Sequence, residues 1–221
     1  MKDIKAIVFD AYGTLFDVNS AAAKCKGKIG DKWEGFANFW RTTQLEYTWL
    51  RSLMKRHKDF WQVTEDSLEK SMKAFKIDSS MKNELLNLYK VLSPYPEVKE
   101  VLKKLKVKEY KLAILSNGTP ALLSELVKSS NLENIFDDLF SVEEVRIYKP
   151  DSKVYDMPIK KYQIKPDEVA FLSANTWDVS GGGNYGYKAI WVNRNNNIFD
   201  NLDYEPKNEI KNLKQLIEVI Q

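Results

Sequence analysis

The sequence predicts an α/β protein with a doubly wound parallel sheet and an inserted helical domain. Short apolar runs that end in polar residues alternate with helical patterns, an order typical of parallel strands joined by right-handed crossovers. Residues 18–92 interrupt this alternation, because they contain helical periodicity and no convincing strand. We therefore expect residues 1–17 and 93–221 to form the α/β core and residues 18–92 to form a helical cap.

The first strand is predicted at Ala6 to Phe9, a short apolar run that ends at Asp10. The Gly13-Thr14 pair that follows indicates a turn. An acid in this place lies at the carboxyl end of a parallel strand, where open α/β sheets build their sites. For Asp10 taken alone, a turn-forming or helix-capping role is an equally good interpretation.

The insertion is predicted to begin with one long helix, whose stripe recurs at three- and four-residue steps. The members of this stripe are Phe36, Trp40, Thr43, Tyr47, Leu50 and Met54. Thr64 is the expected start of a second helix, and Asp78 is the expected cap of a third. The Ser-Pro-Tyr-Pro segment at 93–96 ends the insertion, because a residue before proline is pushed away from the helical region.

Four further apolar runs complete the predicted core sheet. They lie at residues 112–115, 139–142, 169–172 and 189–192. Thr119-Pro120 predicts a helix start after the first of them. A helix from about Asp151 should kink or restart at Pro158, and a last amphipathic helix should reach Ile220. Residues 193–201 are polar enough to form a loop.

Composition excludes several classes of function. The chain has 221 residues and a net charge of only +3, without the basic patch that a nucleic-acid partner would need. It contains no uncharged apolar stretch long enough to cross a membrane, and its start does not read as a signal peptide, so we expect a cytoplasmic protein. Cys25 is the single cysteine, which rules out an intrachain disulfide and a thiolate zinc cluster.

His57 is the single histidine, and it lies in a Lys-Arg-His-Lys stretch at 55–58 that reads as a solvated helix end. Nucleophilic catalysis by a Ser-His or Cys-His pair therefore has little support. A Gly-x-Gly-x-x-Gly match at 181–186 begins eight residues after its strand, too late for a dinucleotide-binding turn. We interpret these glycines as small residues that allow close packing.

Polar segments follow the predicted core strands at their carboxyl ends, where they can converge on Asp10. The segments read Ser-Asn-Gly at 116–118, Tyr-Lys-Pro-Asp at 148–151 and Ser-Ala-Asn-Thr-Trp-Asp at 173–178. Each one alone is an ordinary turn or helix start. Their order and placement together, with Asp-Ala-Tyr-Gly-Thr-Leu-Phe-Asp at 10–17, are specific.

These motifs resemble those of the haloacid dehalogenase superfamily, and in particular those of the (S)-2-haloacid dehalogenases. The resemblance covers nearly the whole chain. It implies a Rossmann-like core with a helical cap, and Asp10 as a covalent nucleophile. The implied reaction is hydrolysis of short (S)-2-haloalkanoic acids to (R)-2-hydroxyalkanoic acids and halide through an ester on Asp10. The implied partner is a small 2-haloacid, and we also expect a homodimer.

The alternative is a small-molecule phosphatase of the same superfamily, whose members read Asp-x-Asp-Gly-Thr in the first motif. In this chain Tyr12 stands where the phosphatases have the second Asp. A phenol with a pKa of roughly 10 cannot shuttle a proton near neutrality. The two acids that phosphatase relatives carry before the final Asp178 correspond to Ser173 and Ala174. We therefore expect no magnesium site and no cofactor. A silent binding protein would leave the whole polar constellation without use.

The resemblance implies catalytic roles for Asp10, Thr14, Arg41, Lys149, Ser173, Asn175 and Asp178. In this assignment Lys149, held by Asp178, keeps Asp10 ionised, and Arg41 receives the halide. It further implies substrate-binding roles for Tyr12, Gln44, Leu45, Phe60, Ser116, Asn117, Tyr155 and Trp177. Among these, Ser116 is the residue expected to receive the substrate carboxylate. Aromatic residues at helical spacing are more often core or interface residues, so their place in the pocket stays open.

Overall fold

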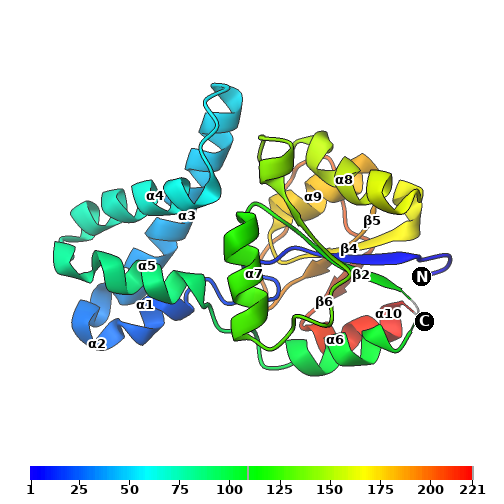
Figure 1. The fold of residues 1–221 in the computed structure, drawn as a ribbon, viewed down its shortest axis with the longest axis horizontal. Coiled ribbons are helices and arrows are strands. Elements are labelled where there is room, and N and C mark those ends of the chain that lie inside the picture. Colours follow the sequence, from blue (N-terminus) through cyan, green and yellow to red (C-terminus); the bar gives the residue numbers. More distant parts are fainter. Residues whose placement is uncertain (109, 221) are drawn as a thin grey trace.

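The computed structural model describes residues 1–108 and 110–220, which form a parallel sheet flanked by helices and a separate group of helices beside it (Figure 1). The six strands are ordered β3-β2-β1-β4-β5-β6, and each neighbouring pair is parallel. The strands are β1 (Ala6–Phe9), β2 (Lys111–Ser116), β3 (Asp138–Ser141), β4 (Val169–Ser173), β5 (Lys188–Val192) and β6 (Asn208–Ile210). The predicted α/β fold class is confirmed.

Strand β1 occupies the point where the strand order reverses. The chain moves from β1 to β2 and β3 on one side, and then returns to β4 and β5 on the other side. All four residues of β1 are fully buried, with Phe9 aligned with Ile114 of β2 and Leu172 of β4. The carboxyl end of β1 is therefore the topological switch point at which ligands bind in open α/β sheets.

Helices cover both faces of the sheet. Helices α8 and α9 lie on one face, and α6 and α10 lie on the other (Figure 1). The core helices are α6 (Val98–Lys106), α7 (Pro120–Ser129), α8 (Ser152–Tyr162), α9 (Thr176–Tyr185) and α10 (Leu216–Val219). Short 3-10 turns lie at Gly30–Lys32, Ser79–Met81, Val142–Glu144, Pro166–Glu168 and Leu213–Gln215.

The glycines of α9 pack as the sequence predicts. A Cβ atom on Gly181 would lie 2.5 Å from the hydroxyl of Tyr155, and one on Gly182 would lie 2.6 Å from the ring of Phe171. Real side chains do not approach so closely, so α9 can lie this near to α8 and β4 because its residues lack side chains there.

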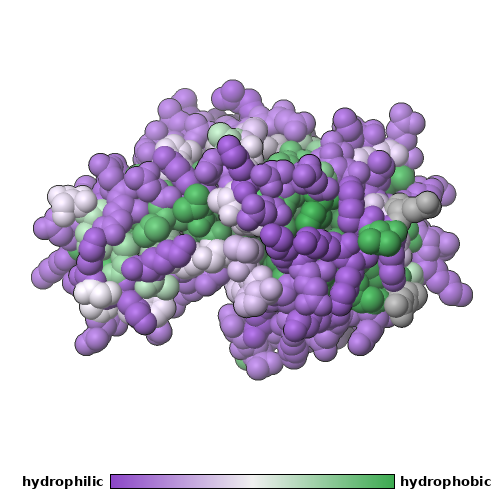
Figure 2. All heavy atoms as spheres, turned by 60° about the horizontal axis from the view of Figure 1, so that its bottom comes forward, coloured by the Kyte–Doolittle hydropathy of each residue, from purple (hydrophilic) through white to green (hydrophobic). Residues whose placement is uncertain are grey.

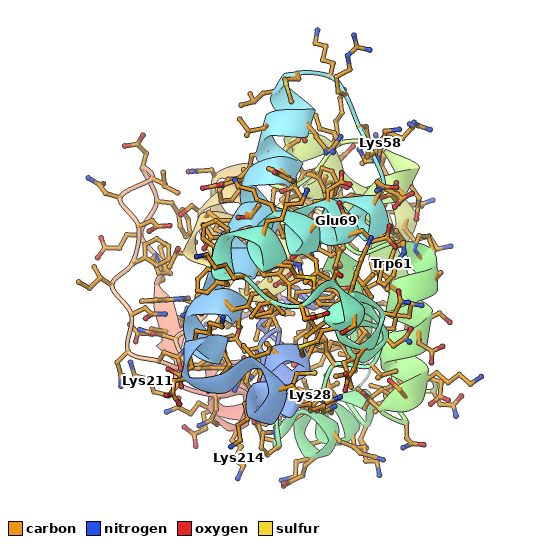
Figure 3. The ribbon with its side chains drawn as sticks, turned by 90° about the vertical axis from the view of Figure 1, so that its left-hand side faces the viewer. Lys28, Lys58, Trp61, Glu69, Lys211 and Lys214 are labelled. Carbon is orange, nitrogen blue, oxygen red and sulfur yellow. The ribbon has the colours of Figure 1, made fainter. Side chains whose placement is uncertain are left out.

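Residues 20–90 are helical and lie at the end of the sheet toward which β1 points (Figure 1). We call this group the cap. Its helices are α1 (Ser20–Lys24), α2 (Lys26–Ile29), α3 (Trp33–Leu53), α4 (Phe60–Phe75) and α5 (Lys82–Lys90). Figure 3 views the cap from outside, with Lys28 on α2 and Glu69 on α4 directed to its surface.

Two segments of chain lie side by side where the cap joins the core. The Asp17 amide donates to the Ser93 carbonyl over 2.9 Å, and the Tyr95 amide donates to the Leu15 carbonyl over 3.0 Å. Phe16 and Pro94 form an isolated antiparallel bridge between these bonds. The exit from the core and the return to it are therefore fixed to each other directly beside the loop that follows Asp10.

Several predicted helix details are wrong. Helix α4 begins at Phe60 and not at Thr64, because the Asp59 carboxylate caps it by accepting from the Gln62 amide. Helix α8 continues through Pro158, whose missing N–H removes one backbone hydrogen bond but does not break so short and well packed a helix. Asp78 caps a 3-10 turn that precedes α5.

The far end of α3 also differs from prediction. Phe36, Trp40 and Thr43 of the predicted stripe are buried, but Leu50 and Met54 are 50% and 60% exposed. The helix extends beyond α4 at this end, as its free tip in Figure 1 shows, so the last turns have little to pack against. Strand β6 was not predicted, and the last helix is a 3-10 turn followed by the short α10.

The molecular surface is polar where Figure 2 views it, with small separate hydrophobic areas. The large exposed apolar side chains include Leu53 at the tip of α3, Val107 after α6 and Ile198 after β5. Within residues 1–108 and 110–220, none of the helices combines the length and apolar character that crossing a membrane requires.

Candidate active site

Asp10 lies at the carboxyl end of β1, where its amide donates to the Leu172 carbonyl of β4 over 2.8 Å. The residue is 5% exposed. Gly13 then turns the chain with a φ of 90°, a left-handed conformation that a glycine adopts without strain. This turn brings Thr14 back against Asp10, so both residues come from one short loop.

Three side chains donate to the same oxygen of Asp10. Oδ2 accepts from Asn175 Nδ2 over 2.9 Å, from Thr14 Oγ1 over 3.1 Å and from Ser173 Oγ over 3.5 Å. The Ala174 amide donates to Thr14 Oγ1 over 2.8 Å, which leaves the hydroxyl proton of Thr14 directed at Asp10. Oδ2 is therefore fixed, and the donors around it favour negative charge on that oxygen.

Lys149 approaches the other oxygen. Its Nζ lies 3.2 Å from Asp10 Oδ1 and 2.9 Å from Asp178 Oδ2, and the residue is 1% exposed. Burial lowers the pKa of Lys149, but the carboxylates of Asp10 and Asp178 outweigh burial and hold that pKa above its ordinary value. The lysine therefore stays charged and provides a fixed counter-charge to Asp10.

Tyr155 lies behind Asp178. Its hydroxyl donates to Asp178 Oδ1 over 2.7 Å, and its side chain is fully buried. Burial, followed by the charge of Asp178, raises the pKa of Tyr155 well above its ordinary value, so the hydroxyl keeps its proton. This geometry does not fit the expected contact of Tyr155 with substrate, because Asp178 is the group that the hydroxyl holds.

The polar groups do not fit a divalent cation. Lys149 Nζ bridges Asp10 and Asp178, and Ser173 and Ala174, which precede Asp178 at the end of β4, carry no carboxylate. Within the described residues, no three His, Cys, Asp or Glu side chains are grouped so that they could hold a metal ion. A hard cation such as magnesium prefers several oxygen ligands, and an ammonium group between the two carboxylates repels it.

Aromatic rings form one wall beside Asp10. The ring of Tyr12 lies 5.2 Å from that of Phe60 and 5.7 Å from that of Tyr89, against which it is stacked. Burial raises the pKa of Tyr12 well above its ordinary value. The Tyr12 hydroxyl is buried and has no hydrogen-bond partner within the described part of the chain, so it can donate to a small molecule bound here.

Arg41 reaches this wall from α3. Its Nη1 donates to Gln44 Oε1 over 2.9 Å, and Gln44 Nε2 donates to Thr64 Oγ1 and to the Tyr89 hydroxyl. Burial raises the pKa of the Tyr12 and Tyr89 phenols and outweighs the charge of Arg41, which lowers that pKa, while the charge of Asp10 raises it. Gln44 is 1% exposed, and its hydrogen bonds position the guanidinium of Arg41. Leu45 follows it on α3 and is half-buried.

Ser116 and Asn117 follow β2 on the other side of Asp10. The hydroxyl of Ser116 accepts from the Gly118 amide over 3.1 Å, and its own proton remains available. Asn117 Oδ1 accepts from the Lys149 amide over 3.1 Å, which leaves its Nδ2 group as a donor. Both residues are buried, as expected for a site at the ends of neighbouring strands.

Trp177 lies at the approach to Lys149. Its ring meets that of Trp49 edge to face, with centroids 5.5 Å apart. Both rings line a cavity of about 450 Å³ whose wall also includes Ser52, Ile147 and Lys149. We call this space the inner cavity. Within the described residues, Lys149 is the only catalytic candidate that lines it, and both core and cap contribute to it.

Sequence reasoning missed Tyr89 and Arg194. Tyr89 is carried by α5, a cap helix for which only the cap at Asp78 was expected. Arg194 follows β5, and it donates to Glu97 Oε1 over 2.6 Å and to the carbonyl of Thr14 over 2.8 Å. The rule that polar residues after strands belong to the site would have found Arg194. Its segment was read only as a loop.

His57 is also misplaced by sequence reasoning. Its side chain is 12% exposed and its Nε2 lies 2.9 Å from Glu143 Oε2. Glu143 Oε1 accepts from the Phe60 amide, so this core residue holds both His57 and the start of α4. The expected solvated helix end is instead a contact between cap and core, and His57 stays outside the residues grouped around Asp10.

Three features define the class of this protein as a hydrolase with an α/β core. They are an aspartate at the end of the central strand that can act as a nucleophile, a lysine that bridges two carboxylates, and a helical cap. Residues 4–186 match the family model described as haloacid dehalogenase-like hydrolase. The chain belongs to this family.

Several proteins that resemble the chain over nearly its full length are named as dehalogenases. It is 38% identical to an (S)-2-haloacid dehalogenase of Pseudomonas fluorescens, over 98% of this chain and 96% of that protein. It is 36% identical to haloacetate dehalogenase H-2 of Moraxella sp. (strain B), over 100% of this chain and 99% of that protein. The L-2-haloacid dehalogenase of Xanthobacter autotrophicus, solved with chloropropionic acid covalently bound, is 32% identical over 98% of both chains, with a TM-score of 0.90.

Proposed function

We propose that the protein hydrolyses short (S)-2-haloalkanoic acids to (R)-2-hydroxyalkanoic acids and halide. The observation that carries this proposal is the environment of Asp10. Its carboxylate is paired with a charged lysine, and Tyr12 occupies the position two residues later in the chain, where a phosphatase would need a second acid. The names of the relatives and the covalently bound chloropropionic acid of one of them support the same chemistry.

In the first step, Asp10 Oδ1 attacks the carbon that carries the halogen, the carbon-halogen bond breaks, and an ester forms on Asp10. We assign the attack to Oδ1 because Oδ2 is held by Asn175, Thr14 and Ser173. Attack from the side opposite the halogen inverts the carbon once. Since halide leaves as a stable anion, no proton has to be supplied.

In the second step, water attacks the carboxyl carbon of Asp10, the acyl-oxygen bond of the ester breaks, and the hydroxyacid leaves. Negative charge then develops on Oδ2, where the three donors are already in place to stabilise it. One proton of the water is taken up by the departing alkoxide oxygen, and the other is released to solvent. Asp10 thereby returns to its carboxylate form with one oxygen exchanged for that of water.

Two groups of donors border the space for substrate. Ser116 and the amides of the loop after β1 are assigned to the substrate carboxylate. Arg41, with the Nδ2 group of Asn117, is assigned to the departing halide, whose developing charge is stabilised best in a dry pocket. Tyr12, Leu45, Phe60 and Trp177 are assigned to the walls of the pocket.

The division of the chain supports closure over this site. We place the core at residues 1–17 and 93–221 and the cap at residues 18–92, with the paired segments around Phe16 and Pro94 as the connection. A homodimer and a location in the cytoplasm remain predictions of the sequence alone.

Halide release from (S)-2-chloropropionate, followed with and without EDTA, tests this function. We expect release in both conditions, formation of (R)-lactate, and no turnover by Asp10→Asn while the variant remains folded. The asparagine amide keeps the shape of the side chain but is a far poorer nucleophile. Magnesium-dependent hydrolysis of a phosphate monoester without halide release would show that the phosphatase alternative is correct.

A further inference from the structure

A second cavity lies between the tip of α3 and the segment that follows β3. Its volume is about 710 Å³, and its lining is Arg51, Ser52, Lys55, Arg56, His57, Lys58, Arg146 and Ile147. We call it the basic vestibule. Six of these eight residues are cationic or can become so, and none is acidic. Figure 3 shows Lys58 on the chain that descends from the tip of α3 to the start of α4.

Most of this positive charge is not neutralised locally. Arg51 pairs with Asp66 over 2.6 Å, and His57 pairs with Glu143 over 2.9 Å. The four exposed cations Lys55, Arg56, Lys58 and Arg146 form no ion pair with any carboxylate within residues 1–108 and 110–220. A net charge of only +3 for the whole chain makes this local excess a concentrated feature and not a general property of the surface.

The basic vestibule adjoins the inner cavity. Ser52 and Ile147 line both spaces, and the inner cavity reaches Lys149 beside Asp10. In this shared lining the Tyr148 amide donates to Ser52 Oγ over 3.2 Å, so an anion bound in the basic vestibule lies next to the cavity that Trp49 and Trp177 line. Lys149 is already paired with two carboxylates, so the attraction for an anion comes from the exposed cations of the basic vestibule, which raise the local concentration of anions beside the inner cavity.

We propose that the basic vestibule binds small monovalent anions and captures the carboxylate of the haloacid on its way to Asp10. The proposal rests on the proposed function for the identity of the anion, but not for the existence of the anion site. Long-range attraction of this kind raises the association rate more than it strengthens the final complex. Halide and hydroxyacid products share the same charge, so the test must distinguish entry from exit.

The test compares two triple variants that each remove three positive charges. The vestibule variant is Lys55→Gln, Arg56→Gln, Arg146→Gln. The control variant is Lys99→Gln, Lys103→Gln, Lys128→Gln, whose side chains are exposed on α6 and α7 and form no ion pair within the part of the chain that the structure describes. None of the six residues belongs to the catalytic or substrate-binding groups, so the fold and the chemistry should persist in both variants.

The first measurement is the kcat/KM for (S)-2-chloropropionate at low and high ionic strength. The vestibule variant should lose at least about threefold in kcat/KM near 0.01 M salt, and the loss should vanish near 1 M salt, where charges are screened within about 3 Å. The kcat should match the wild type, because entry and not exit is affected. The control variant should stay within about twofold of the wild type in both conditions.

The second measurement does not depend on turnover. Iodide and neutral acrylamide are used separately to quench tryptophan fluorescence, since Trp49 and Trp177 line the adjoining cavity. Iodide quenching should fall in the vestibule variant alone, whereas acrylamide quenching should be equal in all three proteins. Unchanged iodide quenching would overturn the anion site. Reduced iodide quenching with unchanged kcat/KM, or with a change in kcat alone, would overturn the entry route.

If the wild type releases no halide from any 2-haloacid, the proposed function fails, and the iodide measurement still decides whether the basic vestibule binds anions.

Discussion

At the scale of single residues, the site separates groups that touch the reacting atoms from groups that hold them. Asp10 is contacted directly by Lys149, Thr14 and Asn175. Tyr155 acts one step further away, through Asp178. This distinction has kinetic consequences, because a positioning residue changes kcat without removing a contact with the bound substrate.

Tyr155→Phe should lower kcat by about tenfold or more and leave KM nearly unchanged. The change removes a hydrogen bond to a fully buried carboxylate, and leaving such an oxygen without a partner costs about 1–3 kcal/mol. The control is Tyr162→Phe, which removes a 2.8 Å bond from the same helix to Asp138, away from the site. Steady-state kinetics of both variants check the prediction, and equal loss of kcat in the two would contradict it.

Arg41→Lys should reduce kcat by more than its conserved charge suggests. A guanidinium offers several donors in a fixed plane, whereas an ammonium is a compact, strongly hydrated charge that cannot be held by Gln44 in the same way. Halide carries more charge in the transition state than in the substrate, so the loss belongs in kcat. A rise in KM alone, measured with one substrate, would instead assign Arg41 to the substrate carboxylate.

The alkaline limit of activity should lie above the ordinary pKa of lysine, roughly 10.4. The pKa of Lys149 is raised, so the pairing of its charge with Asp10 and Asp178 is fully present below the unfolded-state value. This pairing is lost only as the pH rises through the pKa of Lys149 in the folded protein, which is the higher of the two. The pH profile of kcat/KM checks this, and an alkaline inflection near pH 9 assigned to Lys149 would contradict it.

At the scale of elements, the sequence could predict what depends on the ends of strands. The segments that contain Asp10, Lys149 and Asn175 were expected to meet because polar residues after apolar runs converge in a parallel sheet, and the family resemblance selected these residues within them. Tyr89 could not be found in this way, since its contact with Tyr12 depends on how α5 packs against the loop after β1. Strand β6 escaped prediction because three residues of mixed polarity, Asn208–Ile210, carry no apolar run.

Arg194 connects three elements at the joint between cap and core. Its Nη1 pairs with Glu97, which precedes α6, and its Cζ lies 3.8 Å from the ring centroid of Tyr95. Its Nη2 donates to the carbonyl of Thr14. The side chains of Arg194 and Glu97 are only 12% and 8% exposed. The residue thus fixes the loop that carries Thr14 to the chain that returns from the cap.

Arg194→Ala should lower the free energy of unfolding by about 3–5 kcal/mol, because it leaves the buried Glu97 without its counter-charge. Lys104→Ala, which removes the exposed pair with Glu100, should cost less than about 1 kcal/mol. Chemical denaturation of both variants measures the difference. Similar losses in the two would show that the Arg194 pair has no special part in the joint.

The stability difference between wild type and Arg194→Ala should also depend on pH. Burial raises the pKa of Glu97, but the hydrogen bond and charge of Arg194, together with backbone hydrogen bonds, outweigh burial and lower that pKa below its ordinary value. The stabilisation is therefore present above the unfolded-state pKa, roughly 4.3, and is lost as the pH falls through the lower folded-state value. Denaturation at neutral and acid pH should show that the difference in the free energy of unfolding between wild type and Arg194→Ala becomes smaller in acid. A difference that becomes larger in acid would contradict the prediction.

At the scale of the whole molecule, the fold places chemistry where core and cap meet. The core supplies the carboxylate and its donors from the ends of β1 and β4, Lys149 from the segment after β3, and Tyr12 of the aromatic wall. The cap supplies Arg41 and the other two rings of that wall. The sequence indicated this division, but not the contacts from Glu143 to His57 and Phe60 that hold the cap to the core. Those contacts join residues more than 80 positions apart, and no local pattern records them.

The central claim is that Asp10 forms an ester that water opens at the aspartyl carbon. A single turnover in ¹⁸O water, with enzyme in excess over (S)-2-chloropropionate, tests it most directly. We expect the label in the peptide that contains Asp10, while the first hydroxyacid carries unlabelled oxygen from the protein. Label in the first hydroxyacid, with none in that peptide, would contradict the account and make Asp10 a base that activates water against the substrate carbon.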